Sequence, residues 1–304
     1  MRLPLTWLRL LIGASVAISS GAARCELLVY EPFDYQAGTV LDGTAANGLN
    51  LTGNYQATTG FPNQFQLTAR NPGLNYGSLI GAPAPLGNGL TQPSGTTAGG
   101  ATVSVDNDVL TAAGQTIYWS ALFTFSDAQN GNHLASITFN DDNGDLLSFG
   151  EASVGGRAIR VGAQTVSTGG QLISDGADQS FADGDTLLVV GRYFNSAAAG
   201  GDRLDLIGYD TADADMLPLS FDPTDPNAEF AYDLENLDIN FEKITSITFT
   251  IRGNDNNFID ELRIGTTYTA VIPEPGAPAL FVIAGCFAAL LKFGRRQHIP
   301  ARQT

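Results

Sequence analysis

Short segments in which every second residue is apolar follow one another through the middle of the chain. TIYWSALFTF (116–125) and KITSITFTI (243–251) show this alternation most clearly. Because successive side chains of a β-strand point to opposite faces, we expect one face of each segment to enter a core. The residues on these faces are Trp119, Ala121, Phe123 and Phe125 in the first segment, and Thr245, Ile247, Phe249 and Ile251 in the second.

A third segment, LLVVGRYF (187–194), is apolar on both faces and predicts a central strand that is covered on both sides. Further strand candidates are HLASITFN, LLSFG, AIRVGA, RLDLIGYD and FIDELRIG. Turn signals separate these segments, namely DDNGD (141–145), DGD (183–185), AAAGG (197–201) and GNDNN (253–257). No long window before residue 276 follows the 3.6-residue period of a helix. The sequence therefore predicts an all-β, antiparallel sandwich.

Two segments fit this pattern less well. Residues 71–100 are expected to be an irregular connection with one short strand hidden near Leu74–Leu79, because a structureless loop of that length is unusual inside a domain. Residues 222–238 are expected to be an acidic loop with room for one helical turn.

The N-terminal 23 residues are typical of a secretory signal peptide. Arg2 and Arg9 form a basic region, an apolar run extends over residues 10–18, and small residues lead to a cleavage point at Ala22 or Ala23. Lipoprotein processing at the following cysteine is disfavoured, because Arg24 stands where a small residue is required. We therefore expect export by the Sec machinery.

The C-terminal part contains a second apolar run. As a helix, Ala277–Leu291 would be about 22 Å long, short of a hydrocarbon core of about 30 Å. Extension to 276–294, with the Lys292 ammonium reaching outward, gives a spanning helix followed by cytoplasmic arginines. The alternative is a buried helix that closes the domain, and the prolines in front of the run argue against it.

This arrangement resembles the PEP-CTERM sorting signal of exported Gram-negative bacterial proteins. The resemblance covers residues 271–297: the triplet Pro273, Glu274 and Pro275, the apolar run, and the basic pair Arg295 and Arg296. It implies recognition by an exosortase, a precursor held in the inner membrane by its C-terminal helix, and delivery to the cell surface or extracellular matrix. Residues 298–304 would be a cytoplasmic tail.

The two ends of the middle region resemble a second family. LLVYEPFDYQAGTVLDG (27–43) and NNFIDELRIGTTYTAVIPEP (256–275) are similar to the ends of laminin-G-like, concanavalin A-type domains. That resemblance implies a jelly-roll β-sandwich over residues 26–270, in which the first and last strands pair and one sheet has a concave face.

Charge and cysteine content narrow the function classes. Between residues 25 and 272 there are 30 acidic and only eight basic residues, a balance that repels phosphate backbones and excludes nucleic-acid binding. The only cysteines, Cys25 and Cys286, lie in the terminal segments. The predicted domain therefore has neither a disulfide nor a thiolate metal site.

No residue set for catalysis stands out. Glucanases of the concanavalin A type carry Glu-x-Asp-x-Glu on one strand, and this pattern is absent. The nearest approximations, Asp233-Leu-Glu235 and Asp260-Glu261, are interpreted as surface acids on turns. His133 is the only histidine between the signal and the tail, which leaves no triad and no zinc site. We therefore expect a protein that is not an enzyme.

A weak calcium hypothesis remains for DDNGD, since Asp141, Asn143 and Asp145 alternate as in a Ca²⁺ loop. Glycine is missing at the sixth position of that pattern and Ala152 occupies the twelfth. A hairpin turn with Asn143 and Gly144 at positive φ is the favoured interpretation. Asp255 and Asp260 form a second, equally weak candidate.

Sugar binding favours exposed aromatic rings. Trp119 is assigned to the core by its strand face, whereas Tyr55, Tyr76 and Tyr232 lie in polar surroundings where they could stack on a sugar. The leading hypothesis is an exported structural or glycan-binding protein of the cell surface or matrix, with polysaccharide as a partner. The alternatives are a carbohydrate-active hydrolase with a rearranged acid pair and a protein-binding adhesin.

Overall fold

The computed structural model describes residues 26–58, 67–77, 79, 87–92, 99–110, 112–124, 134–151, 159–164, 172–175, 184–213, 217–218, 220–237, 239, 241–252 and 257–272. The predicted signal peptide, the sorting signal with Pro273, Glu274, Pro275, Arg295 and Arg296, and His133 lie outside these residues. Within them, no helix is long and apolar enough to cross a membrane.

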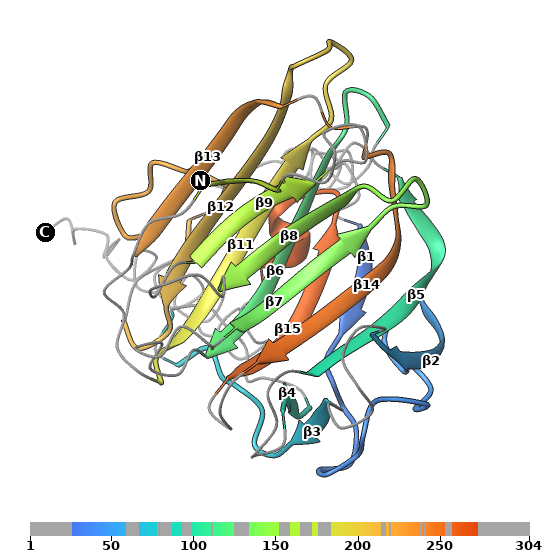
Figure 1. Ribbon diagram of the computed structural model, residues 1–304. Helices are drawn as coiled ribbons and strands as arrows, with labels where there is room; N and C mark the ends of the chain where they lie inside the picture. Colours follow the sequence, from blue (N-terminus) through green and yellow to red (C-terminus); the bar gives the residue numbers. More distant parts are fainter. Residues whose placement is uncertain are drawn as a thin grey trace, which may run out of the picture.

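Two antiparallel β-sheets lie face to face (Figure 1), as the alternating pattern predicts. The first, named here the covered sheet, has the order β13-β12-β11-β6-β15-β4-β3, and β1 also pairs with β15. Its strands are β1 (Leu27–Glu31), β3 (Thr68–Arg70), β4 (Gly89–Thr91), β6 (Thr116–Thr124), β11 (Thr186–Phe194), β12 (Asp202–Asp210), β13 (Phe230–Leu237) and β15 (Phe258–Gly265).

The second, named here the open sheet, has the order β10-β9-β8-β7-β14-β5-β2. Its strands are β2 (Leu51–Ala57), β5 (Gly99–Leu110), β7 (Leu134–Asn140), β8 (Leu146–Glu151), β9 (Ile159–Gln164), β10 (Leu172–Asp175) and β14 (Lys243–Arg252). The one described helix, α2 (Tyr268–Val271), follows the last strand.

The first and last strands pair, as the resemblance to laminin-G-like domains implies. Leu27 lies opposite Gly265 and Glu31 lies opposite Leu262 in an antiparallel ladder. The first residues of β15 pair with β4, which lies on the same side of β15 as β1. The chain therefore closes on itself in the middle of the covered sheet.

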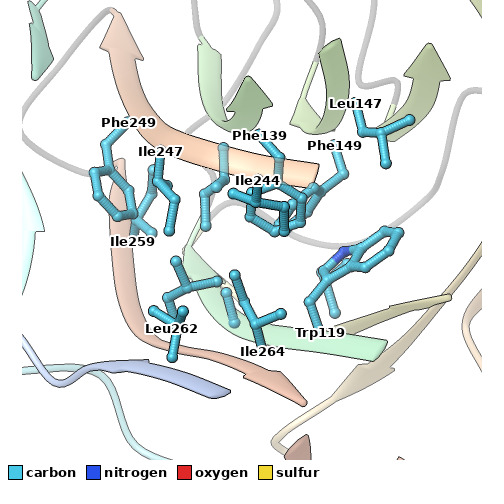
Figure 2. Packing of buried hydrophobic residues seen from close by; sticks show 14 of the residues in the cluster. Trp119, Phe139, Leu147, Phe149, Ile244, Ile247, Phe249, Ile259, Leu262 and Ile264 are labelled. Atoms are coloured by element: carbon cyan, nitrogen blue, oxygen red, sulfur yellow. The ribbon is translucent and has the colours of Figure 1, made fainter. Parts of the chain in front are cut away.

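The main core fills the space between the sheets (Figure 2) and confirms most of the predicted inward faces. The buried residues include Trp119, Ala121 and Phe123 of β6, and Ile247, Phe249 and Ile251 of β14. The prediction for Thr245 is wrong, because the β5–β14 register shifts between Ile244 and Ser246 and buries Ile244 in its place. Such a bulge changes which side chains face inward and leaves no trace in a simple alternation.

LLVVGRYF forms β11 at the centre of the covered sheet, between β12 and β6, as predicted. Leu187 and Val189 enter the main core, whereas Leu188 and Val190 belong to a second apolar cluster on the outer face. This second cluster includes Tyr76, Tyr268 and Val271, with Leu217 and Phe221 packed against it. The covered sheet is thus buried on both faces.

Two predictions about connecting segments are wrong. The expected acidic loop contains the edge strand β13, in which Phe230 and Tyr232 are buried, whereas Asp233 and Glu235 are exposed. These acids interrupt the apolar alternation and make the strand hard to recognise from the sequence. No strand forms over residues 74–77 or at Leu79, and β4 appears at Gly89–Thr91 instead.

Candidate ligand-binding face

Hydroxyl and amide side chains cover much of the outer face of the open sheet. On β5, β7, β8 and β14 these residues alternate with core-facing Val, Ile, Leu and Phe, so the same pattern that builds the core places them outward. The outward residues are Thr102, Ser104, Ser136, Thr138, Asn140, Ser148, Ser246, Thr248 and Thr250, all at least partly exposed.

Strand register aligns these side chains in rows across the sheet. Thr248 lies between Thr102 of β5 and Thr138 of β7, and Thr138 in turn lies opposite Ser148 of β8. The next row places Ser246 between Ser104 and Asn140. Neighbouring strands of a sheet are about 4.8 Å apart, so each row is a ladder of closely spaced polar groups.

Hydrogen bonds connect the ladder and fix its side chains. The Thr102 and Thr248 hydroxyl oxygens are 2.9 Å apart, and the Asn140 amide donates to the Thr248 hydroxyl at 3.1 Å. The Thr138 hydroxyl donates to Ser148 at 3.2 Å. Because a hydroxyl offers one donor and two acceptor sites, each keeps hydrogen-bonding capacity toward solvent.

The chemistry available on this face is neutral hydrogen bonding. Charged groups stand at its margins, at Asp106, Lys243 and Arg252. The described outward side chains of β2, β5, β7, β8 and β14 include no aromatic ring and no pair of carboxyl groups on one row. The described part of the face is therefore suited to contact a hydroxyl-rich ligand, and no acid and base of the kind that glycoside cleavage requires are found together in it.

The interpretation of Asp260 and Glu261 as surface acids on a turn is wrong. Both lie on β15 and are almost fully buried, at a register shift between Asp260 and Arg263 where Glu261 has a positive φ of 54°. Both carboxyl groups contact the loop after β3, which covers this part of the sheet. Burial raises the pKa of Asp260 to about 8. Asp260 accepts from the Leu74 backbone N–H at 2.8 Å, which anchors a loop.

Glu261 is the centre of a second buried cluster. It accepts hydrogen bonds from the hydroxyls of Tyr30 and Tyr76, each at 3.0 Å, and from the Arg263 guanidinium at 2.9 Å. These three partners come from β1, β15 and the loop after β3. These contacts hold the strand junction together, and the burial of both acids keeps them away from any ligand.

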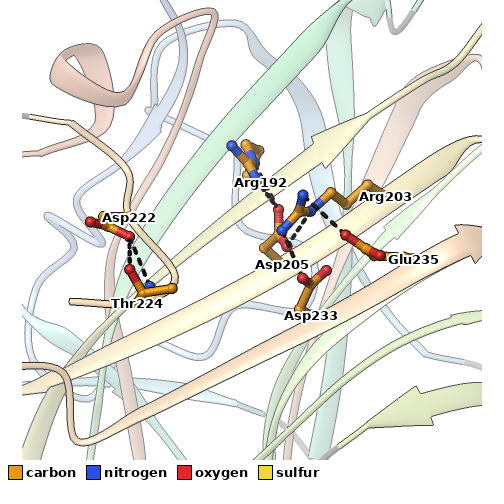
Figure 3. A network of polar contacts seen from close by, with 7 residues as sticks. All are labelled: Arg192, Arg203, Asp205, Asp222, Thr224, Asp233 and Glu235. Carbon is orange, nitrogen blue, oxygen red and sulfur yellow. Dashed lines mark hydrogen bonds and ion pairs between the residues drawn. The ribbon is translucent and has the colours of Figure 1, made fainter. Parts of the chain in front are cut away.

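Asp233 and Glu235 are also misinterpreted as turn residues, since both lie on β13. Arg203 of β12 pairs with Asp233 at 2.7 Å and with Glu235 at 3.2 Å, and it also binds the buried Asp205 (Figure 3). Burial and the neighbouring Asp205 raise the pKa of Asp233 to about 6. The two acids thus belong to an ion-pair network at the edge of the covered sheet.

The proposed calcium residues form the turn between β7 and β8. Asp141 accepts from the backbone N–H groups of Asn143 at 3.1 Å, Glu242 at 2.8 Å and Lys243 at 3.2 Å. Gly144 has a φ of +85°, as the hairpin interpretation predicts, whereas Asn143 does not adopt positive φ. No group of three His, Cys, Asp or Glu side chains in the described ranges is placed to hold a metal ion.

The predicted aromatic contacts to sugar are wrong for all three tyrosines. Tyr55, Tyr76 and Tyr232 are buried. The Tyr55 hydroxyl donates to the buried Glu31 at 2.6 Å, and Tyr232 stacks on Phe230 with ring centroids 5.4 Å apart. Their polar sequence neighbours are surface residues of the same strands or loops. Trp119 is a core residue, as predicted.

Comparisons with known proteins bear on the fold alone. Neither protein-family models nor curated proteins give a match to the chain. Solved structures that resemble it include an endo-1,3-beta-glucanase from Streptomyces sioyaensis, at 10% identity over 81% of this chain and 98% of that one, with a TM-score of 0.45. At these values the similarity assigns neither a family nor an activity.

Two further solved structures also resemble the chain. The VIP36 exoplasmic/lumenal domain matches at 11% identity over 64% of this chain and 88% of its own, with a TM-score of 0.38. A legume lectin-like domain from Entamoeba histolytica matches at 8% identity over 60% and 87% of the two chains, with a TM-score of 0.39.

Proposed function

We propose that this chain is an exported, non-enzymatic protein of the cell surface or extracellular matrix that binds polysaccharide. The observation that supports this most directly is the open sheet, whose outer face is an ordered ladder of hydroxyl and amide groups centred on Thr248. In this proposal the sandwich is of the concanavalin A-like, jelly-roll type.

Polysaccharide fits the chemistry of the face. Sugar hydroxyls both donate and accept, as the Thr, Ser and Asn side chains do, so a sugar chain can replace the water on these groups without a charge being buried. Each contact is weak, but a polymer that crosses several rows makes many of them at once, and linked contacts raise the apparent affinity. The described residues of the covered sheet offer no comparable surface, because α2 and apolar residues of the connecting loops lie over its outer face.

The hydrolase alternative lacks a supporting observation. The described acids nearest to a catalytic pattern, Asp260 and Glu261, are buried, and Asp233 and Glu235 are held by Arg203. The adhesin alternative requires a protein-binding patch, and Leu49 is the one large hydrophobic side chain that is exposed among the described residues.

The proposal includes the trafficking signals at both ends. Residues 1–23 direct the chain to the Sec machinery, and residues 271–297 act as the PEP-CTERM signal for an exosortase, with Pro273, Glu274 and Pro275 as the recognised triplet. In support, the triplet, the apolar run and the basic pair Arg295 and Arg296 follow one another in the order of that signal.

Retention of full-length protein on immobilised neutral polysaccharides tests the binding face. Replacement of Thr138 and Thr248 by Val keeps their shape and removes two hydroxyls, which should weaken retention roughly tenfold. Thr266→Val, on an exposed threonine after β15, is the matched control and should bind like the unmodified protein. Equal retention of all variants, or no retention on any polysaccharide, would contradict the proposal.

A further inference from the structure

A pocket of about 770 Å³ opens at one end of the sandwich, beside the hydroxyl-bearing face. The β7–β8 turn, the β11–β12 connection and the start of β14 form its walls. Five alanines line it, at 112–113 and 197–199, together with the charged side chains of Asp142, Asp202, Glu242 and Lys243.

The pocket is preformed, because backbone hydrogen bonds to buried carboxylates fix its walls. Asp202 accepts from the Ser196 N–H at 2.7 Å and from the Ile239 N–H at 2.9 Å, which joins the β11–β12 connection to the segment before β14. Asp141 secures the opposite wall through its bonds to the N–H groups of Glu242 and Lys243. The short side chains of the five alanines leave the interior open.

The polar groups in the walls are predominantly acceptors with negative charge. Lys243 pairs with Asp142 at 2.8 Å, and hydrogen bonds with Asp141 and Lys243 lower the pKa of Asp142, which stays ionised. Glu242 is exposed at the rim, and no hydrogen bond or ion pair to its carboxylate is found among the described residues. Asp202 adds a third carboxylate against the single lysine.

A buried polar group behind this wall also lacks a partner. The Tyr193 hydroxyl is fully buried and makes no hydrogen bond. Tyr193 stands near the end of β11, two residues before Asn195 of the pocket wall, and its burial together with the charges of Asp202, Asp145 and Asp141 raises its pKa. The interior next to the pocket therefore has an unused hydrogen-bond donor as well as its carboxylates.

We propose that this pocket binds the protonated amino group and ring of an amino sugar unit within a polysaccharide. The choice of a sugar rests on the proposed function, whereas the choice of a cationic one rests on the pocket. Carboxylate acceptors such as Glu242 and Asp142 form charge-assisted hydrogen bonds with an ammonium group. The alanine walls suit the apolar C–H faces of a sugar ring, and the net negative charge disfavours uronic or sulfated sugars.

The location of the pocket allows one polymer to use both sites. Asn140 is the last residue of β7 on the outer face of the open sheet, and the turn that lines the pocket starts directly after it. On β14, Lys243 of the pocket precedes Ser246 of the face by three residues. A sugar chain that runs along these strands reaches the pocket at their end.

Titration of the full-length protein with a glucosamine hexamer, and in parallel with the N-acetylglucosamine hexamer, tests the inference. The charged hexamer should bind at least roughly tenfold more tightly. Glu242→Gln should remove about that factor for the glucosamine hexamer and leave the N-acetylated one unchanged. Ala198→Trp fills the pocket without altering charge and should abolish the preference.

The matched control is Asp213→Asn. It also removes one negative charge, but Asp213 follows the C-terminal end of β12, whereas Asp202 of the pocket stands at the N-terminal end of that strand. It should retain full preference for the glucosamine hexamer.

If Asp213→Asn and Glu242→Gln weaken binding equally, the preference reflects overall charge and the pocket is not the site. If the protein retains neutral polysaccharide through Thr248 but shows no amino-sugar preference, only the pocket inference fails. If glucosamine binds through Glu242 but no neutral polysaccharide is retained, only the proposed face fails.

Discussion

Gly191 lies directly opposite Trp119 in the β6–β11 ladder, and the indole occupies the space that a side chain at residue 191 would need. A Cβ atom at this position would lie 2.1 Å from the indole Cε2 atom. Trp119 is fully buried and packs edge-on against Phe139 at a centroid distance of 5.5 Å. The two residues form a matched pair, in which one supplies volume to the core and the other leaves room for it.

Gly191→Ala should therefore destabilise the protein by about 3 kcal/mol, because a fully packed core cannot accept the extra methyl group. Chemical denaturation monitored by tryptophan fluorescence or circular dichroism measures this change. In the double variant with Trp119→Phe, the smaller ring relieves the clash, so the combined cost should be less than the sum of the two single costs. Simple additivity would contradict a direct contact.

Removal of the Tyr55 hydroxyl should cost more than removal of the Tyr35 hydroxyl, although both donate to the same buried Glu31 oxygen. The Tyr55 bond is 2.6 Å long and the Tyr35 bond is 3.3 Å long. We expect about 2 kcal/mol for Tyr55→Phe and about 1 kcal/mol for Tyr35→Phe, since bonds to a carboxylate are strong when short. Urea denaturation of both variants decides the order, and a reversed order would rule out this explanation.

Within the ion-pair network at the edge of the covered sheet, the buried Asp205 should contribute more to the free energy of unfolding than the exposed Glu235. Asp205 is fully buried and binds Arg192 at 2.7 Å and Arg203 at 2.9 Å, whereas the Glu235 side chain is 55% exposed. Asp205→Ala should destabilise by about 3 kcal/mol, because it leaves two guanidinium groups without their shared partner. Glu235→Gln should cost less than about 1 kcal/mol. Equal costs, measured by thermal or chemical unfolding, would show that burial does not set the strength of this network.

Stability should fall as pH rises from about 4 to 8 through the titration of Asp260. Burial raises its folded-state pKa to about 8 from an ordinary value of 3.8, so the folded state binds the proton more tightly. The stabilisation is complete below the unfolded pKa and is lost as pH rises through the folded one, at up to about 1.4 kcal/mol per pH unit. Glu31, whose pKa burial also raises, contributes in the same direction.

Urea denaturation of the unmodified protein and of Asp260→Asn at several pH values measures this contribution. The variant should show a shallower decline over the same window, because its side chain does not titrate. Parallel pH profiles for the two proteins would place the titrating group elsewhere.

The sorting hypothesis predicts a processing defect when the triplet is altered. Replacement of Pro273, Glu274 and Pro275 by alanines should leave the sandwich folded and trap the protein as a longer, membrane-associated precursor in an exosortase-bearing bacterium. Fractionation with immunoblotting detects the change, and Asp213→Asn serves as a control that should be processed normally. Normal processing of the triple variant would contradict a role for the triplet.

The sequence by itself determined which segments become strands where alternation is strong and uninterrupted. The apolar faces of β6 and β14, the doubly buried β11, and the lack of a Glu-x-Asp-x-Glu strand were all visible without coordinates. These features are local, because the two-residue period of a strand is set by the backbone itself. The hydroxyl residues that alternate with the core positions of β7 and β14 are part of the same pattern.

Only the tertiary structure decided which strands are neighbours and where the alternation slips. The contact between Thr102 and Thr248 joins residues 146 positions apart, and nothing local to either strand specifies it. The irregularity near Ile244 changes which residue at the start of β14 faces the core. The one after Asp260 lies where the sequence predicts surface acids and the structure buries Glu261. Register and bulges depend on long-range pairing and on which arrangement buries the most apolar surface, so a single-strand pattern does not contain them.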